Sequence, residues 1–150
     1  ETTISKSQVL FCILQQDEIP RIQERTLLNL SRCLLLLADM DKSDTNRVTK
    51  YCNAVVLGCT LAISCSSYHD NSSCQPSLES KKITTTTEEK ARYIRSKAYA
   101  KLNKYKHATN DIQHLLRINP QNRDALQLQK KLKLQLGKEK KLNKKLAKDV

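Results

Sequence analysis

Cysteine and histidine are the most reactive side chains of this sequence, and their spacing limits the chemistry that they support. The chain has six cysteines and three histidines. No two cysteines form a C-x-x-C pair, and the histidines lie away from ligand spacing, so a zinc ribbon or a thioredoxin-like site is not expected. Five cysteines lie in apolar stretches, where a free thiol packs as a small hydrophobe. We therefore expect structural, reduced cysteines and no metal or other cofactor at Cys12, Cys33, Cys52, Cys59, Cys65 and Cys74.

The motifs of the common enzyme classes are missing from the sequence. There is no P-loop, G-x-S-x-G or H-E-x-x-H segment and no pair of carboxylates at catalytic spacing. With only two glycines, the chain has little material for a phosphate-binding loop. We therefore expect a protein that is not an enzyme. Reduced cysteines also indicate a reducing compartment, so the expected location is the cytoplasm, with the nucleus as an alternative.

Composition and charge favour a single helical domain. The chain has 150 residues, is rich in leucine and lysine, lacks tryptophan and carries a formal net charge of +12. It shows no run of about 20 apolar residues, so no membrane span is expected. No aromatic residues interleave the lysines of its C-terminal part, so specific nucleic-acid binding is not expected either. The chain starts at Glu1 without a recognisable signal peptide, which suggests a fragment or a processed chain.

Apolar periodicity and turn residues divide the chain into helices. Pro20 suits the first turn of a helix, so a break is expected at residues 17–20. Helices are expected at residues 4–16, from Pro20 to about residue 38, and near residues 46–64, the last capped by Asp44 or Thr45. Further helices are expected from Thr87, which is itself a suitable N-cap, to about residue 103, at about residues 105–119, and from about residue 122 to the end. The expected organisation is a half-repeat (1–19), a repeat (20–65), a long polar loop (66–87), a second repeat (88–120) and a C-terminal capping helix (121–150).

The second of these repeats carries the spacing of a tetratricopeptide repeat, a pair of antiparallel helices of about 34 residues. Ser96 takes the small site and Tyr99 follows three residues later. Ala108 and Ile112 are four residues apart, and Pro120 closes the unit. Small residues at the helix crossing allow two backbones to approach, and larger ones fill the groove beside them. The spacing predicts an all-α fold, a short tetratricopeptide solenoid with a long basic C-terminal helix.

A weaker copy of the repeat precedes it. Asn29-Leu30-Ser31-x-x-Leu34 matches the first half, and Val48 with Cys52 matches the second half. Asn29-Leu30-Ser31-Arg32-Cys33 resembles the helix of chaperone-binding tetratricopeptide domains. The segment Lys90-Ala91-Arg92-Tyr93-Ile94-Arg95-Ser96-Lys97-Ala98-Tyr99 and the Leu/Lys-rich end are similar to those of the large immunophilins, the FKBP and large-cyclophilin class.

This resemblance implies a co-chaperone adaptor whose concave groove binds the acidic C-terminal tail of heat-shock protein 90 or 70. Such a carboxylate clamp needs amide and cationic donors on a concave wall. By the resemblance, Asn29 and Lys90 take two clamp positions. Ile94 stands where the family has an arginine, and Arg95 beside it is a candidate helper. Any prolyl-isomerase domain would lie outside this chain.

Other partners are open on the sequence alone. A scaffold of the same fold would bind a non-chaperone segment in its groove, which Ile94 favours. The residues after Pro120 include ten basic and three acidic ones, giving +7 of the net charge, so this amphipathic helix is also a candidate binder of calmodulin or anionic surfaces. An incomplete solenoid exposes apolar surface, so a homodimer is a further expectation.

Overall fold

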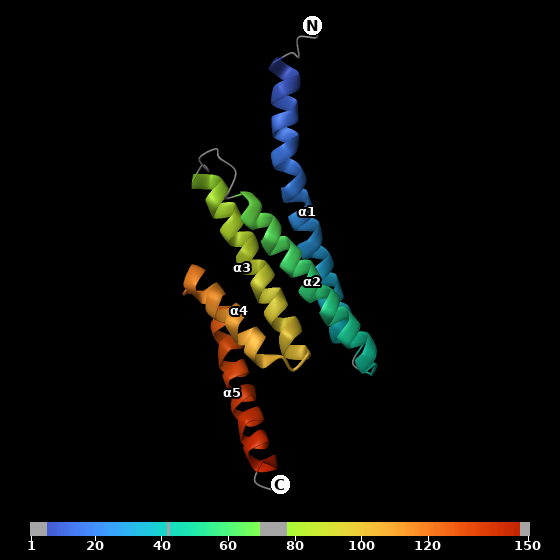
Figure 1. The fold of residues 1–150 in the computed structure, drawn as a ribbon, viewed down its shortest axis with the longest axis vertical. Coiled ribbons are helices and arrows are strands. Elements are labelled where there is room, and N and C mark those ends of the chain that lie inside the picture. The colour runs from blue at the N-terminus through green and yellow to red at the C-terminus, as the bar shows by residue number, and fades with distance from the viewer. Residues whose placement is uncertain (1–5, 42, 70–77, 148–150) are drawn as a thin grey trace.

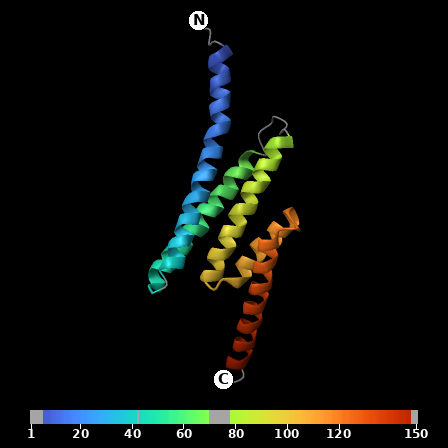
Figure 2. The ribbon, with the colours of Figure 1, turned by 180° about the vertical axis from the view of Figure 1, so that it is seen from behind.

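The structure, a computed structural model, describes the backbone of residues 6–41, 43–69 and 78–147 and the side chains of residues 21–41, 43–65 and 86–147. These residues form five helices and no strand. Helices α1, α2 and α3 lie side by side, and α4 and α5 continue the stack beyond α3 (Figures 1 and 2). The fold is therefore an all-α stack of helical hairpins, as predicted. Its elements are α1 (Lys6–Met40), α2 (Thr45–His69), α3 (Leu78–Lys101), α4 (Tyr105–Ile118) and α5 (Arg123–Leu146).

Polar side chains cap two of the helices. Asp44 Oδ1 accepts hydrogen bonds from the backbone N–H groups of Asn46 at 2.9 Å and Arg47 at 3.1 Å, so it caps α2. Asn122 Oδ1 accepts from the N–H of Ala125 at 3.0 Å and caps α5. Each cap satisfies backbone donors that a helix start leaves without a partner. The sequence-based prediction of Asp44 as a cap is confirmed.

A tight turn joins α3 to α4. Asn103 has φ 57°, in the left-handed region that asparagine tolerates better than most residues. The N–H of Lys104 donates to the carbonyl of Tyr99 at 2.9 Å, and that of Asn103 donates to Ala100 at 3.2 Å. These two bonds form the C-terminal cap of a helix with a left-handed residue after it. The turn reverses the chain, so α4 packs back on α3.

The expected break at residues 17–20 is wrong, because α1 is one helix of 35 residues that runs through Pro20. A proline within a helix removes one backbone donor, and the residues on both sides of Pro20 keep the helix going. The N-terminal part of α1 projects past the ends of α2 and α3 (Figure 1). The described part of the half-repeat, residues 6–19, is thus continuous with the repeat that follows it.

The expected loop 66–87 is also wrong over most of its length. Helix α2 continues to His69 and α3 already begins at Leu78, while residues 70–77 lie outside the described part of the chain. Serine and threonine lower helix propensity only slightly, and packing of a neighbouring helix overrides such a preference. Thr87 accordingly lies inside α3 and is not its N-cap.

The core has two parts that share α3. The first lies between α1, α2 and α3 and includes Leu35, Val55, Cys59 and Ile94. The second joins α4 and α5, where Ala108, Ile112 and Leu115 have no exposed surface. Ser96, Ala108 and Ile112, the small and large sites of the predicted second repeat, are all buried. Tyr99 is half-buried, with its ring 5.3 Å from that of His107.

In the first hairpin, α1 and α2 lie close together at Ser31 and Gly58. A Cβ atom added at Gly58 would lie 2.7 Å from Ser31 Oγ, closer than van der Waals contact allows. Gly58 therefore takes the small site of α2, further along the helix than Val48 and Cys52, which were the expected matches. Cys52 is fully buried and Val48 partly so, which places both in the same core.

The expectation that no stretch of the chain is apolar enough to span a membrane is wrong for α2. In the described residues one segment, Thr45–Cys65, reaches the required length and apolar composition. A core helix passes the same test, and α2 lies between α1 and α3 (Figure 1). Its side chains Cys52, Val55, Cys59 and Ala62 are wholly buried there. These four side chains of α2 thus serve the core of the bundle, while Leu57 and Leu61 of the same helix are exposed.

Candidate functional site

A groove of about 680 Å³ runs between α1 and α3. The two helices run in the same direction, so their residues face one another level by level (Figures 1 and 2). Arg25 and Thr86 lie at one end, Asn29 and Lys90 follow, and the salt bridge between Lys101 Nζ and Asp39 Oδ1, 2.6 Å long, joins the helices at the other end. The lining is Arg25, Leu28, Asn29, Arg32, Leu35, Leu36, Asp39, Thr86, Thr87, Lys90, Tyr93, Ile94 and Lys97.

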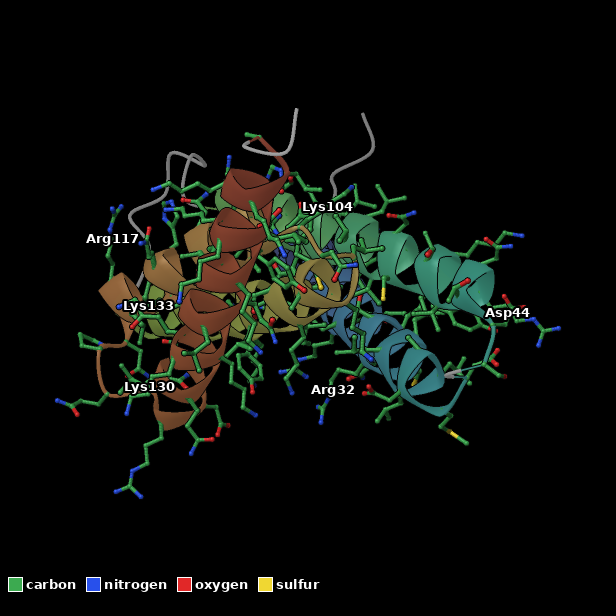
Figure 3. The ribbon with its side chains drawn as sticks, turned by 90° about the horizontal axis from the view of Figure 1, so that it is seen from below. Arg32, Asp44, Lys104, Arg117, Lys130 and Lys133 are labelled. Atoms are coloured by element: carbon green, nitrogen blue, oxygen red, sulfur yellow. The ribbon has the colours of Figure 1, made fainter. Side chains whose placement is uncertain are left out.

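The walls of this groove are cationic. Arg25, Arg32, Lys90 and Lys97 line it, and none of them takes part in an ion pair within the described residues. The one carboxylate of the lining, Asp39, is bound to Lys101. Arg32 reaches outward from α1 (Figure 3). The groove therefore carries an excess of positive charge that attracts an acidic ligand.

The floor of the groove is apolar. Leu28, Leu35 and Ile94 are buried beneath the cations, and each keeps less than a tenth of its surface exposed. Lys97 Nζ lies 4.6 Å from the centre of the Tyr93 ring, a cation–π contact that holds both side chains at the groove edge. An apolar floor under polar walls is the usual construction of a peptide site, because a few polar groups orient a ligand whose apolar parts are buried.

The structure brings two of the three predicted site residues together. Asn29 of α1 and Lys90 of α3 line the same groove at the same level, and both side chains are exposed. An amide and an ammonium at one level are suitable donors for a carboxylate. Ile94 also lies in this groove, in its floor, so the position where the resembled family has an arginine is apolar here.

The third predicted residue, Arg95, lies elsewhere. Its Nε and Nη2 donate to the two carboxylate oxygens of Asp111 on α4, at 2.8 and 2.6 Å, and its Nη1 donates to Thr60 Oγ1 on α2 at 2.9 Å. Hydrogen bonding by Asp111 raises the pKa of the Arg95 guanidinium. Adjacent residues on a helix point about 100° apart, so Arg95 faces away from the groove that Ile94 lines. Its role is to join helices, which corrects its expected role as a helper in the groove.

Sequence reasoning missed three cations of the groove. Arg25, Arg32 and Lys97 were not among the expected ligands, although Arg25, Asn29 and Arg32 follow the helical spacing of four and three residues. Lys90 and Lys97 are two turns apart on α3. Residues at these spacings share one helix face, so a search for polar residues in register with Asn29 and Lys90 identifies them.

The cysteines with described side chains are free thiols at Cys33, Cys52, Cys59 and Cys65. Burial raises the pKa of the Cys52 thiol, and it raises the pKa of Cys59 to about 11. Only a thiolate is a good nucleophile or metal ligand, so these two cysteines are inert near neutral pH. Cys12 and Cys74 lie outside the part of the chain whose side chains are described.

Sequence comparison places a known repeat on the second half of this architecture. The pattern of the Fis1 C-terminal tetratricopeptide repeat matches residues 90–140, which cover the second half of α3, all of α4 and most of α5. The match spans about a third of the chain. Searches of curated proteins and of solved structures found no match.

Together with the stacked hairpins, this match identifies the chain as an all-α, tetratricopeptide-like helical solenoid. Solenoids of this kind present extended concave surfaces, which suggests a module for protein–protein interaction. The groove between α1 and α3 lies on the face that two successive first helices form. Resemblance to the immunophilin class is not supported by the comparison, so the identity of the partner is a separate question.

Proposed function

We propose that the groove binds an acidic peptide in extended form and that the C-terminal tail of heat-shock protein 90 or 70 is its first candidate ligand. The observation that supports this is the cationic lining by Arg25, Arg32, Lys90 and Lys97 around an apolar floor. Acidic side chains of the ligand would pair with these cations, and an apolar side chain would lie against Leu35 and Ile94.

The dimensions of the groove suit a short peptide. Arg25 and Asp39 are fourteen positions apart on α1, which corresponds to about 21 Å along a helix. An extended peptide advances about 3.3 Å per residue, so roughly six residues fill the groove. The Asp39–Lys101 salt bridge marks one end and makes that end less attractive to an anion. We therefore place the most acidic part of the ligand near Asn29 and Lys90.

The test is calorimetric titration of the chain with a Met-Glu-Glu-Val-Asp peptide, as the free acid and as the C-terminal amide. Micromolar binding of the acid, with much weaker binding of the amide, would support a clamp for the terminal carboxylate. Lys90→Ala and Asn29→Ala should each weaken that binding about tenfold, as loss of a charge-assisted hydrogen bond does. Failure of both peptides to bind would sink the proposal.

Matched controls are available on α4. Lys106 and Asn110 are exposed and lie outside the groove lining, so Lys106→Ala and Asn110→Ala remove the same chemical groups at a distance from it. Both controls should bind the acid peptide as the unchanged chain does. Equal weakening by Lys106→Ala and Lys90→Ala would mean that net charge alone attracts the peptide.

A second candidate function is a scaffold that binds an internal acidic segment of a non-chaperone partner. Ile94 supports it, because an apolar residue in the floor replaces a cation that would hold a terminal carboxylate. This scaffold would bind the amide and the acid equally. The same titration therefore separates the two functions.

The expected location and self-association are part of the proposal. Free thiols at Cys52 and Cys59 suit a reducing compartment, which favours the cytoplasm or the nucleus. Leu30, Leu57 and Leu61 expose about half of their surfaces, which favours a homodimer. Imaging of the tagged chain tests the location, which exclusion from both the cytoplasm and the nucleus would contradict. Light scattering over a range of concentrations tests the homodimer, which a monomeric mass at every concentration would contradict.

A further inference from the structure

The distal half of α5 projects beyond the bundle. Leu132, with 2% of its surface exposed, is the last buried residue of the helix. A Cβ atom added at Gly137 would meet no other atom within 4 Å, so the neighbouring helices have ended there. Both ribbon views show α5 continuing past α4 and past the end of α3 (Figures 1 and 2). This part of α5 is a preformed helix whose sides are open to a partner.

One face of this segment alternates lysine with leucine. Lys131, Leu134, Lys138, Leu142 and Lys145 follow one another at intervals of three or four residues and so share one side of the helix. All five are exposed, and Leu134 and Leu142 keep 68% and 59% of their surfaces accessible. We call these five residues the Lys/Leu stripe. The stripe extends over fourteen positions, or about 21 Å.

Positive charge dominates around the stripe. Lys141 lies beside it, and Glu139 is the one acidic residue of α5 beyond its first turn. No lysine of α5 takes part in an ion pair within the described residues. Lys130 and Lys133, earlier in the helix, lie on the side of the molecule away from α1 and α2 (Figure 3). The charge of this region is therefore available to an anionic partner.

The side-chain types select among anionic partners. Nucleic-acid sites use arginine for bidentate contacts and aromatic rings for stacking, and α5 has no aromatic residue and no arginine after Arg123. Exposed leucines gain nothing from a phosphate backbone, but they gain from the boundary between lipid headgroups and acyl chains. Lysines beside them reach the lipid phosphates while their methylene stems stay apolar. Alternating lysine and leucine thus suits a charged surface with an apolar layer beneath it.

We propose that the Lys/Leu stripe of α5 binds the surface of an anionic lipid bilayer, with the helix lying flat along the headgroups. The lysines pair with lipid phosphate and carboxylate groups, and Leu134 and Leu142 enter the headgroup boundary. Leu132 packs on α4 from a different side of the helix, so binding leaves the fold intact. This surface is separate from the groove between α1 and α3, and its function does not depend on the peptide proposed there.

The experiment is cosedimentation of the full chain with phosphatidylcholine vesicles, with and without about 30% phosphatidylserine. We expect binding to the anionic vesicles at about 0.1 M salt and much weaker binding at about 0.5 M, because salt screens surface charge. Binding to neither kind of vesicle, or equal binding to both, would overturn the proposal. The proposal would also be overturned if duplex DNA displaced the chain from the anionic vesicles as effectively as added anionic vesicles do. Any polyanion would then suffice.

Two stripe variants and one control separate the stripe from net charge. Lys131→Glu/Lys138→Glu/Lys145→Glu should lower the vesicle affinity about a hundredfold. Lys50→Glu/Lys104→Glu/Lys106→Glu changes the net charge equally at exposed sites elsewhere and should lower it much less. Leu134→Ser/Leu142→Ser should lower it severalfold and leave the helix content by circular dichroism unchanged. If the stripe and control lysine variants lost vesicle affinity equally, or if the leucine variant lost none, the stripe would not be the lipid-binding surface.

A second copy or a calmodulin-like protein is a competing occupant of the stripe. If Leu134→Ser/Leu142→Ser converts a dimer into a monomer in light scattering while vesicle binding is unchanged, the stripe is a dimer contact and the lipid proposal is wrong. If calmodulin with calcium displaces the chain from vesicles only at large excess, the lipid surface is the preferred partner. Displacement at equal concentration would contradict the proposal.

Discussion

Arg95 of α3 and Asp111 of α4 are joined by two hydrogen bonds, from Nε to Oδ2 at 2.8 Å and from Nη2 to Oδ1 at 2.6 Å. The Asp111 side chain is 3% exposed and that of Arg95 is 14% exposed. Arg92 Nη1 adds a longer contact of 3.4 Å to Asp111, and Arg95 also bonds to Thr60 of α2. Three helices are thus linked through this one ion pair, which fixes how the second hairpin is oriented on the first.

Removal of Asp111 should therefore destabilise the fold. In Asp111→Ala the guanidinium of Arg95 loses its partner in a poorly solvated site, and loss of one member of a buried pair costs about 3–5 kcal/mol. Because Arg95 keeps some exposure, we expect the lower end of this range. Urea denaturation followed by circular dichroism measures the free energy of unfolding.

The matched control is Asp124→Ala, since Asp124 is exposed in the first turn of α5. This change should lower the free energy of unfolding by less than about 1 kcal/mol, the scale of a charge–dipole interaction at a helix start. Equal effects of the two substitutions would show that the Arg95–Asp111 pair is no more important than a surface charge.

The two glycines of the chain, Gly58 and Gly137, should respond in opposite ways to substitution by alanine. Alanine favours helices by about 1 kcal/mol over glycine, so Gly137→Ala, where a Cβ meets nothing within 4 Å, should stabilise the chain by roughly that amount. In Gly58→Ala the new Cβ would lie 2.7 Å from Ser31 Oγ, so either the Ser31 side chain or the two helices must shift. Overpacking of this kind costs about 1–3 kcal/mol.

The double variant Ser31→Ala/Gly58→Ala removes the oxygen that the new methyl group meets. If the two single effects simply added, the double variant would be less stable than Ser31→Ala by the full cost of Gly58→Ala. We expect a smaller difference, because the clash is relieved. Thermal and urea unfolding of the four chains give this coupling directly. Strict additivity would mean that Ser31 Oγ does not limit the approach of the helices.

Local signals explain which parts of the structure the sequence predicts. The second repeat follows from the spacing of Ser96, Ala108 and Ile112, and the start of α2 follows from the cap at Asp44. The helical residues 66–69 and 78–87 have polar, weakly helical sequence, and their state depends on neighbouring helices that spacing alone does not reveal. Pro20 misleads for the same reason, since the surrounding helix outweighs one lost backbone bond.

The candidate site also contains residues that helical spacing predicts and residues that it does not. Asn29 and Lys90 lie on faces that helical spacing fixes, so resemblance was enough to place them in one groove. Arg95 points about 100° away from Ile94 by helical spacing alone, but its partner is a carboxylate sixteen residues away on another helix, which spacing does not reveal. Gly58 differs because its partner, Ser31, is set by the pairing of α1 with α2, which is longer than the common repeat. Contacts between residues on different helices are thus the information that the spacing of residues along one helix does not contain.

The buried thiol of Cys59 gives a prediction in alkali. Its pKa in the folded chain is raised from 9.0 to about 11, first of all by burial. The folded state therefore holds this proton more tightly than the unfolded chain does. The corresponding stability is complete below pH 9 and is lost as the pH rises toward 11, by about 2–3 kcal/mol in total.

Comparison with Cys59→Ala isolates this effect from the titration of lysines and tyrosines. The difference in free energy of unfolding between the two chains should shrink as the pH rises from about 9 to about 11, and it should be constant between about pH 6 and pH 8. The exposed Cys33 supplies a kinetic check, since it should react with a disulfide reagent at about pH 8 far faster than Cys59. A pH-independent difference would contradict the raised pKa.

The cations of the groove give the last prediction. Arg25 and Arg32 lie on α1 at the level of Thr86 to Tyr93, so they extend the positive wall beyond Asn29 and Lys90. Arg25→Glu/Arg32→Glu should reverse the charge of this wall and weaken binding of an acidic pentapeptide by at least about a hundredfold, since each arginine–carboxylate contact contributes about 1.5–3 kcal/mol. Replacement of the same arginines by lysine keeps the charge and should cost less than about tenfold, through loss of bidentate geometry alone. Calorimetry at two salt concentrations measures both effects, and the lysine variant should show the steeper salt dependence. If the glutamate variant binds as the unchanged chain does, the acidic peptide lies elsewhere on the solenoid.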